Sequence, residues 1–515
     1  MKDFNKILKV CVASWRCLKD YMRRENKNLL DALSRWGPSL SELKRLSASI
    51  EPYDFQREVY EKLRRLADTG GVLVVEAPTA SGKTEAILST YLSQLVEDDW
   101  WLAPRLIYTL PTRALTLTTF GRLTAYSKGI KVFFSKPALP TSFEYGLTVE
   151  YKHYLYGGVM VAATLDAVVY GYVALRRPGG MRNPRISMPT ALLASSLLVL
   201  DEVQLYQDRH YYTPRIIGSV MGVLARAGVV LVYMTATLPT VLLEELIKGG
   251  GSAESFPVER VSVNCVKRGE VSVDVKPMIS GEKLPVFLKK KDIVSLIRSE
   301  VNGGRHVLVV ANTIDRAIKS YRVLSKIFGD RVLLIHGRMA NWDREAREGR
   351  LYSASYVVVS TQVIEAGFDL DAGLLITEIA PPDSLMQRIG RVARSGGVGQ
   401  AIIVDVESTA PYLREVVENT KEVLRRDGSV LESAIKSVES ARDLLDRVYT
   451  PSIVDEISRK AEKYIVKSFS FLQKIRLFSL PPRENFSLRE GFYLSLIHIS
   501  EPTRPRLISY AVFCL

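Results

Sequence analysis

Cysteine and histidine are scarce in this sequence, which has four cysteines and five histidines among 515 residues. Neither type forms the closely spaced pairs that zinc sites use, and four scattered cysteines cannot build a disulfide framework for a chain of this length. The scarcity argues against a zinc finger, a zinc hydrolase and a disulfide-built fold. Together with the lack of a secretory signal, it predicts a protein of the reducing cytoplasm.

The sequence also lacks a long uninterrupted hydrophobic run. Charged residues are spread through residues 1–20, so these residues contain no signal-peptide core. The most hydrophobic long stretch, Ile216–Met234, contains Arg226 and several glycines. Because a membrane span needs about 20 consecutive apolar residues, we interpret this stretch as a helix end followed by a buried strand. We therefore expect no membrane partner.

Acidic residues are fewer than basic ones, with 56 Asp and Glu against 70 Lys and Arg, which gives a net charge of +14. The hydrophobic fraction of 47% and the charged fraction of 24% are ordinary for a folded chain. These values exclude a disordered tail and a collagen-like fibre. A basic surplus on a folded chain indicates a polyanionic partner, with nucleic acid ahead of a membrane surface.

The hydrophobic pattern divides the chain into five segments. Residues 1–50 and 411–494 have the character of helices. Residues 51–258 and 259–410 each contain short apolar, β-branched runs separated by helical segments, a pattern typical of parallel sheets buried on both faces. The sequence predicts an α/β protein with two successive parallel-sheet domains between helical ends. Residues 495–515 fit neither pattern and resemble translated vector sequence, so they are excluded from the prediction of the fold.

The expected strands are the most apolar of these short runs. The expected join between the two domains extends from about Val258 to Lys291 and includes the alternating residues of Val271–Val275 and then Lys289–Lys291. In the first domain the strands are Val72–Val75, Leu106–Thr109, Lys131–Phe134, Val159–Ala162, Leu197–Leu200 and Val230–Met234. In the second they are Val307–Val310, Val332–Ile335, Tyr356–Val359, Leu374–Thr377 and Ala401–Val404. Loops at the carboxyl ends of such strands bind ligands.

A phosphate-binding loop follows the first predicted strand. The strand leads into a loop of small residues that begins at Ala77, where the full pattern has glycine, and ends in Gly-Lys-Thr at a helix start. Loop N–H groups and the helix N-terminus favour phosphate, the lysine reaches the terminal phosphates, and the threonine hydroxyl binds Mg²⁺. A chance Gly-Lys-Thr is the alternative. The residues expected to bind ATP here are Ala80, Ser81, Gly82, Lys83 and Thr84.

Two acidic residues, Asp201 and Glu202, end the predicted strand Leu197–Leu200. Carboxylates at the end of a buried strand are costly unless a metal or water meets them. We expect Asp201 to hold Mg²⁺ and Glu202 to orient or deprotonate the attacking water. A solvated acidic turn is the alternative, but the Gly-Lys-Thr loop in the same domain favours the catalytic interpretation.

An arginine pair in the second domain, Arg391 and Arg394, supplies the positive charge that hydrolysis of a triphosphate requires. Their spacing of three predicts that they share one helix face and converge on one anion. With the acids in one domain and the arginines in the other, nucleotide would close the two domains and hydrolysis would let them part. This arrangement predicts a motor.

Together with several shorter motifs, these sites resemble the ordered motifs of superfamily 2 helicases over residues 52–396. The resemblance implies two tandem RecA-like domains and gives each motif a role. Tyr53 and Gln56 correspond to the adenine-reading motif, and Gly367 and Asp369 to the motif beside the ribose. The motif Thr235–Thr237 couples hydrolysis to movement. The expected nucleic-acid contacts, chiefly to phosphates, are Arg113, Thr164, Arg338 and Thr361.

Within the superfamily, the segment Ser360–Asp371 is most similar to the CRISPR-associated signature helicase of type I systems. The resemblance implies an ATP-dependent translocase that moves on single-stranded DNA and unwinds target DNA after recruitment by an RNA-guided surveillance complex. Many members also carry an HD nuclease, which needs an adjacent His-Asp pair; no histidine of this sequence precedes Asp, so we expect a separate HD nuclease subunit. Gln204 departs from the family, which usually has histidine there.

Two alternatives to this function remain. The first is a DExH-type RNA or DNA-repair helicase, which would use the same motor on another substrate. The second is a nucleic-acid-binding scaffold that no longer hydrolyses ATP. The presence of Lys83, Asp201, Glu202 and the arginine pair argues against the scaffold.

Overall fold

The computed structural model divides the chain into two compact units. The first unit comprises Met1–Leu238 and Leu242–Val263, and the second comprises Pro239–Val241 and Asn264–Arg459, apart from the residues that the structure does not describe. The structure describes residues 2–25, 27–78, 81–145, 156–172, 188–206, 212–248, 256–263, 269–351, 354–365, 370–394 and 396–459, together with Glu462, Val466 and Leu472. The stretch 495–515 lies outside the described residues.

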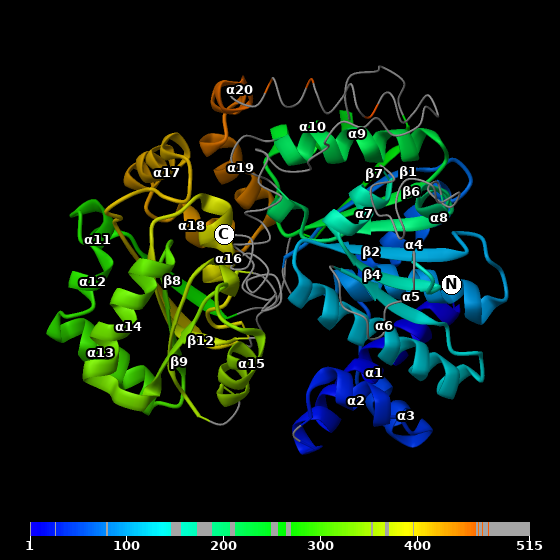
Figure 1. Ribbon diagram of the computed structural model, residues 1–515, viewed down its shortest axis with the longest axis horizontal. Helices are drawn as coiled ribbons and strands as arrows, with labels where there is room; N and C mark the ends of the chain where they lie inside the picture. Colours follow the sequence, from blue (N-terminus) through cyan, green and yellow to red (C-terminus); the bar gives the residue numbers. More distant parts are fainter. Residues whose placement is uncertain are drawn as a thin grey trace, which may run out of the picture. The chain divides into compact units, whose positions relative to one another are not determined.

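A parallel sheet forms the centre of the first unit (Figure 1). Its strands lie in the order β3-β4-β2-β5-β6-β1-β7, so the acidic residues after β5 and the loop after β1 are separated by one strand, β6. The strands are β1 (Gly71–Glu76), β2 (Arg105–Leu110), β3 (Thr141–Glu144), β4 (Met160–Thr164), β5 (Ser196–Leu200), β6 (Val230–Thr235) and β7 (Val258–Ser262).

Helices cover both faces of this sheet, and the central strands β1, β4, β5 and β6 are buried along their whole length. Their continuous apolar sequences follow from burial on two faces. On one face α1 packs against α5 and α6, and α4 packs beside β1. The helices are α1 (Lys2–Glu25), α2 (Leu29–Arg35), α3 (Leu40–Ala48), α4 (Asp54–Leu66), α5 (Lys83–Glu97), α6 (Arg113–Phe134), α7 (Leu165–Tyr172), α8 (Met188–Ala194), α9 (Tyr212–Arg226) and α10 (Thr240–Lys248), with the short 3₁₀ helix η1 (Val203–Tyr206).

One predicted strand of the first unit is wrong. Lys131–Phe134 forms the last turn of α6 rather than a strand. The aromatic and β-branched residues of this run fit a strand locally, but α6 continues through them while packed along α1. The interpretation of Ile216–Met234 is confirmed, because α9 ends at Arg226 and β6 begins at Val230.

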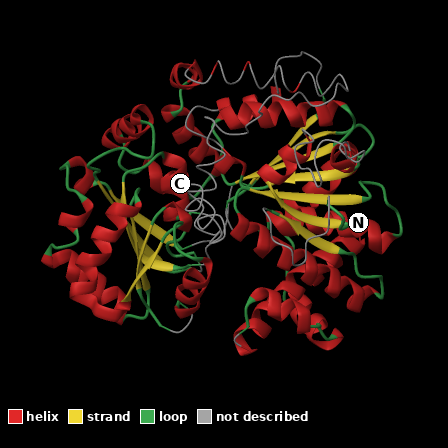
Figure 2. Ribbon diagram, in the orientation of Figure 1, coloured by secondary structure: helices red, strands yellow, loops and turns green. Residues whose placement is uncertain are grey.

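The second unit is built on another parallel sheet, with helices on its two faces (Figure 2). The strand order is β10-β11-β9-β12-β13-β8. The strands are β8 (Glu270–Asp274), β9 (His306–Val310), β10 (Val332–Ile335), β11 (Val357–Ser360), β12 (Ala372–Glu378) and β13 (Val398–Val404). The five expected strands of this domain match β9 to β13 within a few residues, whereas β8 lies in the segment expected to join the domains. Two parallel sheets with helices on both sides confirm the predicted α/β fold class.

The helices of the second unit also divide between the sheet faces. A hydrophobic core joins α12, α13 and α14 to one face, and α16, α18 and α19 pack together with β12 and β8. The helices are α11 (Lys276–Ile279), α12 (Leu284–Phe287), α13 (Lys291–Asn302), α14 (Ile314–Phe328), α15 (Asn341–Arg350), α16 (Pro382–Ile389), α17 (Arg414–Arg426), α18 (Val430–Ala434), α19 (Val438–Val448) and α20 (Pro451–Arg459), with the 3₁₀ helices η2 (Gly329–Arg331) and η3 (Gln362–Ile364). Within the described ranges, no helix has the length and hydrophobicity needed to cross a membrane.

Candidate nucleotide-binding and hydrolysis site

The loop between β1 and α5 encloses a lysine ammonium. Lys83 is the first residue of α5 and is buried, and its Nζ donates to the carbonyl oxygens of Ala77 and Pro78, the latter at 3.2 Å. Gly82 caps the helix with φ +91°, a conformation that side chains other than glycine rarely adopt. The positive helix end and the ammonium therefore lie together at this loop, as phosphate binding requires. Ala80 lies outside the described residues.

Gln56 braces this loop from α4. Its Oε1 accepts from the backbone N–H of Tyr53 at 2.9 Å, and its Nε2 donates to the Gly82 carbonyl at 3.1 Å. A Cβ atom at Gly82 would lie 2.6 Å from that Nε2, so a side chain there would displace the Gln56 amide from the loop. The Tyr53 ring is 58% exposed and stacks on Phe55 with centroids 6.2 Å apart. This pair of groups can recognise a planar base through an amide edge and an aromatic face.

A tyrosine that the sequence analysis missed joins the two expected Mg²⁺ ligands. The Tyr108 hydroxyl donates to Asp201 Oδ2 at 2.8 Å and lies 3.2 Å from the Thr84 hydroxyl. Burial, followed by the nearby Glu202 carboxylate, raises the pKa of Asp201 to about 6, and Lys83 opposes that rise. The charged form of Asp201 is thus stabilised less than in water, which favours a cation beside it.

The donor set fits Mg²⁺ bound with a triphosphate. Mg²⁺ usually takes one or two protein oxygens and completes its shell with phosphate oxygens and water. Thr84 and Asp201 offer such oxygens, and neighbouring Ser81 has a buried hydroxyl with no hydrogen-bond partner among the described residues. These residues would hold the metal, which would supply charge neutralisation for phosphoryl chemistry.

A hydrogen-bonded series of side chains extends from the acidic pair to the end of β6. The Glu202 N–H donates to Asp201 Oδ1 at 2.8 Å, and the Gln204 amide donates to Glu202 Oε2. The Thr235 hydroxyl donates to Gln204 Oε1 at 2.6 Å and accepts from the Thr237 N–H at 3.1 Å. Gln204 is buried and uses both ends of its amide, so it orients Glu202 without carrying a titratable group near neutral pH.

In the second unit, the arginine pair does not occupy a helix face as predicted. Helix α16 ends at Ile389, and the chain then forms a bridge with the start of β12 and passes through Ala393 at φ +48°. Arg391 donates from Nε to the Ile364 carbonyl at 3.1 Å and from Nη2 to the Glu365 carbonyl at 2.6 Å. The N–H of Arg394 donates to Asp371 Oδ1 at 2.8 Å. The spacing of three implied a helix, but glycine at position 390 ends it.

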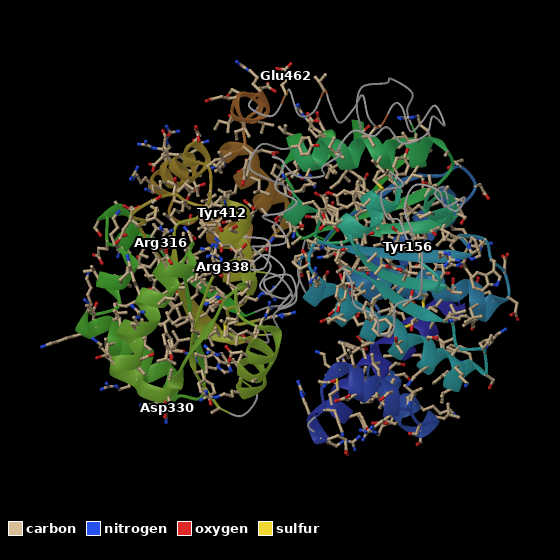
Figure 3. The ribbon with its side chains drawn as sticks, in the orientation of Figure 1. Tyr156, Arg316, Asp330, Arg338, Tyr412 and Glu462 are labelled. Atoms are coloured by element: carbon tan, nitrogen blue, oxygen red, sulfur yellow. The ribbon has the colours of Figure 1, made fainter. Side chains whose placement is uncertain are left out.

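Arg388, which the sequence analysis quoted only as part of the motif, is the most deeply buried charge of this unit, with no exposed surface. Its guanidinium donates to Glu365 Oε1, the Thr377 hydroxyl and the Tyr412 hydroxyl at 2.8 to 2.9 Å. Arg316 makes a second buried pair with Glu378 at 2.8 Å; Figure 3 labels Arg316 and Tyr412. These pairs fix the loop after β11 and the end of β12. In one sequence taken alone, a glutamate and an arginine in two separate apolar segments give no sign that they form an ion pair.

The residues expected to contact nucleic acid follow neighbouring strands in each unit. Arg113 begins α6 after β2 and lies 5.5 Å from the Tyr145 ring centroid, and Thr164 ends the adjacent strand β4. Exposed Arg338 follows β10, and buried Thr361 follows the adjacent β11. In each unit the two residues therefore lie at the same edge of one sheet. Gly367 and Asp369 lie outside the described residues.

Two family models match this chain. Residues 53–245 match the DEAD/DEAH box helicase model, and residues 303–397 match the model for CRISPR-associated nuclease/helicase Cas3, C-terminal. With two parallel α/β units and a Gly-Lys-Thr loop, these matches define an ATP-dependent helicase of superfamily 2.

A curated relative identifies the family. The CRISPR-associated helicase Cas3 of Thermoproteus tenax is 31% identical over 437 residues, which cover 83% of this chain and 72% of that protein. The chain therefore belongs to the CRISPR-associated Cas3 helicase family, and the predicted resemblance is confirmed. The chain spans only 41% to 51% of the length of several other curated relatives.

Solved structures show the same fold at lower identity. T. fusca Cas3 with AMPPNP has a TM-score of 0.64 at 17% identity, over 88% of this chain and 62% of that chain. A chain of a CRISPR RNA-guided surveillance complex in a pre-nicking state has a TM-score of 0.56 at 19% identity, over 86% of this chain and 56% of that chain. Both likenesses confirm the predicted fold of two RecA-like domains.

Proposed function

We propose that this helicase is a translocase that uses ATP to move on single-stranded DNA and unwinds target DNA in type I CRISPR interference. The hydrogen-bonded series from Thr84 through Tyr108, Asp201, Glu202 and Gln204 to Thr235 supports this proposal most strongly. The series joins the expected Mg²⁺ and water-activating residues to Thr235 at the end of β6, in the motif that the family resemblance links to movement. A change at the phosphates would thereby reach this motif.

Each residue has a proposed role in hydrolysis. Lys83 binds the terminal phosphates, Thr84 and Asp201 hold Mg²⁺, and Glu202 accepts a proton from the attacking water. Arg391 and Arg394 stabilise charge on the γ-phosphate. We also propose that the nucleotide is bound by Tyr53, Gln56, Ala80, Ser81, Gly82, Gly367 and Asp369. The last two positions and Ala80 rest on the family resemblance alone.

The proposed domains are 51–258, which binds ATP, and 259–410, which supplies the arginines, flanked by helical regions 1–50 and 411–494. Arg113 and Thr164 of the first, with Arg338 and Thr361 of the second, would contact strand phosphates. Such contacts are nearly independent of sequence and weaken with salt. The expected site of action is the cytoplasm.

The proposed partners are an RNA-guided surveillance complex and a separate HD nuclease. A chain of a surveillance complex with a similar fold supports the first partner. The second partner rests on the family resemblance alone. Purified protein is therefore expected not to cut DNA with any divalent metal. Metal-dependent cleavage that copurifies through several columns would contradict a separate nuclease.

The function is tested by measuring ATP turnover alone, with single-stranded DNA and with single-stranded RNA, followed by unwinding of matching duplexes. We expect strong stimulation by DNA and unwinding along a DNA strand. Stimulation by RNA alone would instead establish the RNA-helicase alternative. No stimulation by any single strand, with nucleic acid still bound, would establish the scaffold.

A further inference from the structure

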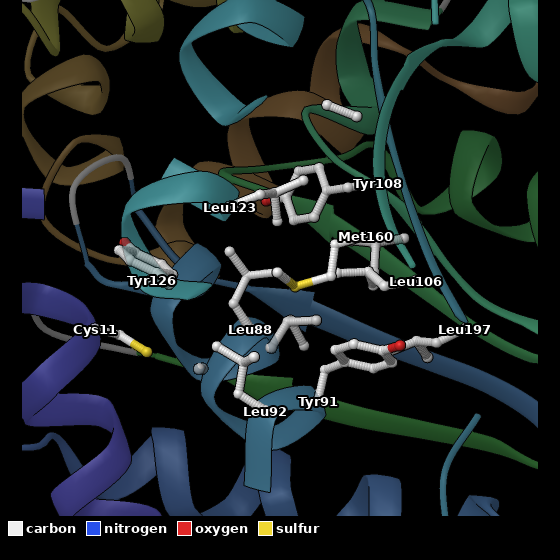
Figure 4. Packing of buried hydrophobic residues seen from close by; sticks show 14 of the residues in the cluster. Cys11, Leu88, Tyr91, Leu92, Leu106, Tyr108, Leu123, Tyr126, Met160 and Leu197 are labelled. Carbon is white, nitrogen blue, oxygen red and sulfur yellow. The ribbon is translucent and has the colours of Figure 1, made fainter. Parts of the chain in front are cut away.

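A partly buried ion pair lies directly behind the phosphate-binding loop and is not used by the hydrolysis site. Glu85 is in the first turn of α5, one residue after Thr84. Its Oε1 accepts from the Tyr126 hydroxyl at 2.7 Å and lies 3.4 Å from Arg122 Nη1. Arg122 and Tyr126 are on adjacent turns of α6, so two side chains of one helix hold the start of the other. Figure 4 labels Tyr126 of α6 and Leu88 of α5 within the same hydrophobic core.

The N-terminal helix α1 closes this cluster from outside. The Arg122 guanidinium lies over the Trp15 ring, with its carbon 5.3 Å from the centroid. Ser14, the preceding residue, comes so close to α6 that a Cβ atom at Gly129 would lie 1.8 Å from its Oγ. Helix α1 therefore limits how far Arg122 can move away from Glu85.

The charge of Arg122 is only partly matched where it lies. Its Nε is buried and has no hydrogen-bond partner among the described residues. Burial disfavours the charged guanidinium, and the carboxylates of Glu85 and, more weakly, Asp201 favour it. In a partly buried site a charge pair is screened less by salt than on the surface, so removing one partner has a larger effect.

Helix α6 connects this pair to a proposed nucleic-acid contact. Arg113 is the first residue of α6, and Arg122 lies nine positions later, about 14 Å along the helix axis at 1.5 Å per residue. Because a packed helix moves as one body, a shift at Arg113 displaces Arg122 as well. Glu85 follows Thr84 directly, so a displacement of Arg122 changes the support of the helix start that binds phosphate.

We propose that Arg122, acting through Glu85 and held by Trp15, is the positioning residue that transmits nucleic-acid binding at α6 to the phosphate-binding start of α5. This inference rests on the proposed stimulation of ATP hydrolysis by single-stranded DNA. It assigns a role to the N-terminal helix, which supports the residue that couples the two ligands.

The test compares wild type with R122Q, E85Q, W15L and the double variant R122Q/E85Q. For each, kcat and KM for ATP are measured with and without saturating single-stranded DNA, and DNA affinity is measured separately. We expect R122Q and E85Q each to lower the stimulation ratio by about fivefold or more, the range of a typical coupling between sites. DNA affinity should stay within about twofold, and R122K should restore part of the ratio.

The double variant sharpens the test. If the pair acts as one unit, R122Q/E85Q lowers the ratio no further than either single change. K131Q removes one positive charge from the exposed last turn of the same helix and should leave the ratio and the DNA-free rate unchanged. If R122Q does not fold, the nearly isosteric E85Q carries the same comparison.

An unchanged ratio in both R122Q and E85Q would overturn this inference. An equal fall of the DNA-free and DNA-stimulated rates, with a lower melting temperature, would show a structural role only and would overturn it as well. Failure of the proposed function would look different, because wild type itself would then show no stimulation by single-stranded DNA.

Discussion

The two units differ in how fully hydrogen bonds and opposite charges compensate their buried charged groups. Beside the β1–α5 loop, two adjacent carboxylates share few donors, and the pKa of Asp201 is raised to about 6 by burial and by Glu202. In the second unit, Arg388 has carboxylate and hydroxyl acceptors on several sides. A buried charge with few partners indicates a place where a ligand completes the site. A buried charge with hydrogen-bond partners on several sides indicates a structural role.

The comparison extends to Arg391, whose side chain is held by the carbonyls of Ile364 and Glu365. Those residues belong to the loop that Arg388 fixes through the Glu365 carboxylate. Arg388 is thus a positioning residue for Arg391. The two arginines, only three apart, therefore have different expected effects on stability and on rate.

The largest expected effect is in the first unit, at the β1–α5 loop and the adjacent carboxylates. Lys83→Ala removes the only ammonium that the described loop places beside the proposed phosphate site, and ATP turnover should fall by at least about 10³-fold. Glu202→Gln should also stop hydrolysis while ATP binding persists. Steady-state turnover and nucleotide binding check both variants. Normal turnover in either one would refute the site assignment.

Arg388→Ala tests the second unit, where the buried charge has hydrogen-bond partners on several sides. Its removal leaves the Glu365 carboxylate buried without its charged partner, and the free energy of unfolding should fall by about 3 to 5 kcal/mol. Chemical denaturation measures this loss. As a control, Arg426→Ala removes an exposed pair with Glu422 and should change stability by less than about 1 kcal/mol. Equal effects of the two changes would remove the distinction drawn between the units.

Tyr108→Phe is expected to have an intermediate effect. It deletes the hydroxyl between Thr84 and Asp201 while the ring stays in the core, so the lost hydrogen bond is worth about 1 kcal/mol. The concentration of Mg²⁺ needed for half-maximal turnover should rise severalfold. Tyr91→Phe, in the same core but away from these oxygens, is the matched control. The same Mg²⁺ requirement in both variants would exclude a role for Tyr108 in the metal site.

The smallest expected effect is that of Gln204→His. Histidine can bridge Glu202 and Thr235 when neutral, but its protonated form cannot accept from the Thr235 hydroxyl. Turnover should stay within a few fold of wild type at pH 8 and fall relative to wild type below about pH 6.5. A pH profile that matches wild type throughout would show that the bridge does not control the rate.

The sequence alone predicts the parallel sheets well, because strands buried on two faces carry continuous apolar runs that local reasoning detects. It fails at Lys131–Phe134, where a strand-like composition is overridden by packing of α6 along α1. The sequence also predicts wrongly that the arginine pair shares a helix face, because spacing alone does not show that α16 stops at Ile389.

The residues that the sequence alone does not identify share one property. Their roles depend on contacts with residues that are far away in the chain. Tyr108 matters because β2 lies beside β5, so its hydroxyl reaches a carboxylate 93 residues away. The Arg388–Glu365 pair and the Arg122–Glu85 pair likewise join separate elements. Motifs identify the residues that bind ligands, whereas the residues that hold those motifs in place become visible only in the fold.

The central proposal is that arginines of the second unit complete the ATP site of the first. The most direct measurement is ATP turnover by Arg394→Ala together with its affinity for ATP and for single-stranded DNA. The account predicts a fall in kcat of about 10³-fold, the range reported for arginines that stabilise a transferring phosphoryl group, with both affinities nearly unchanged. Turnover equal to that of wild type would contradict a site shared between the two units.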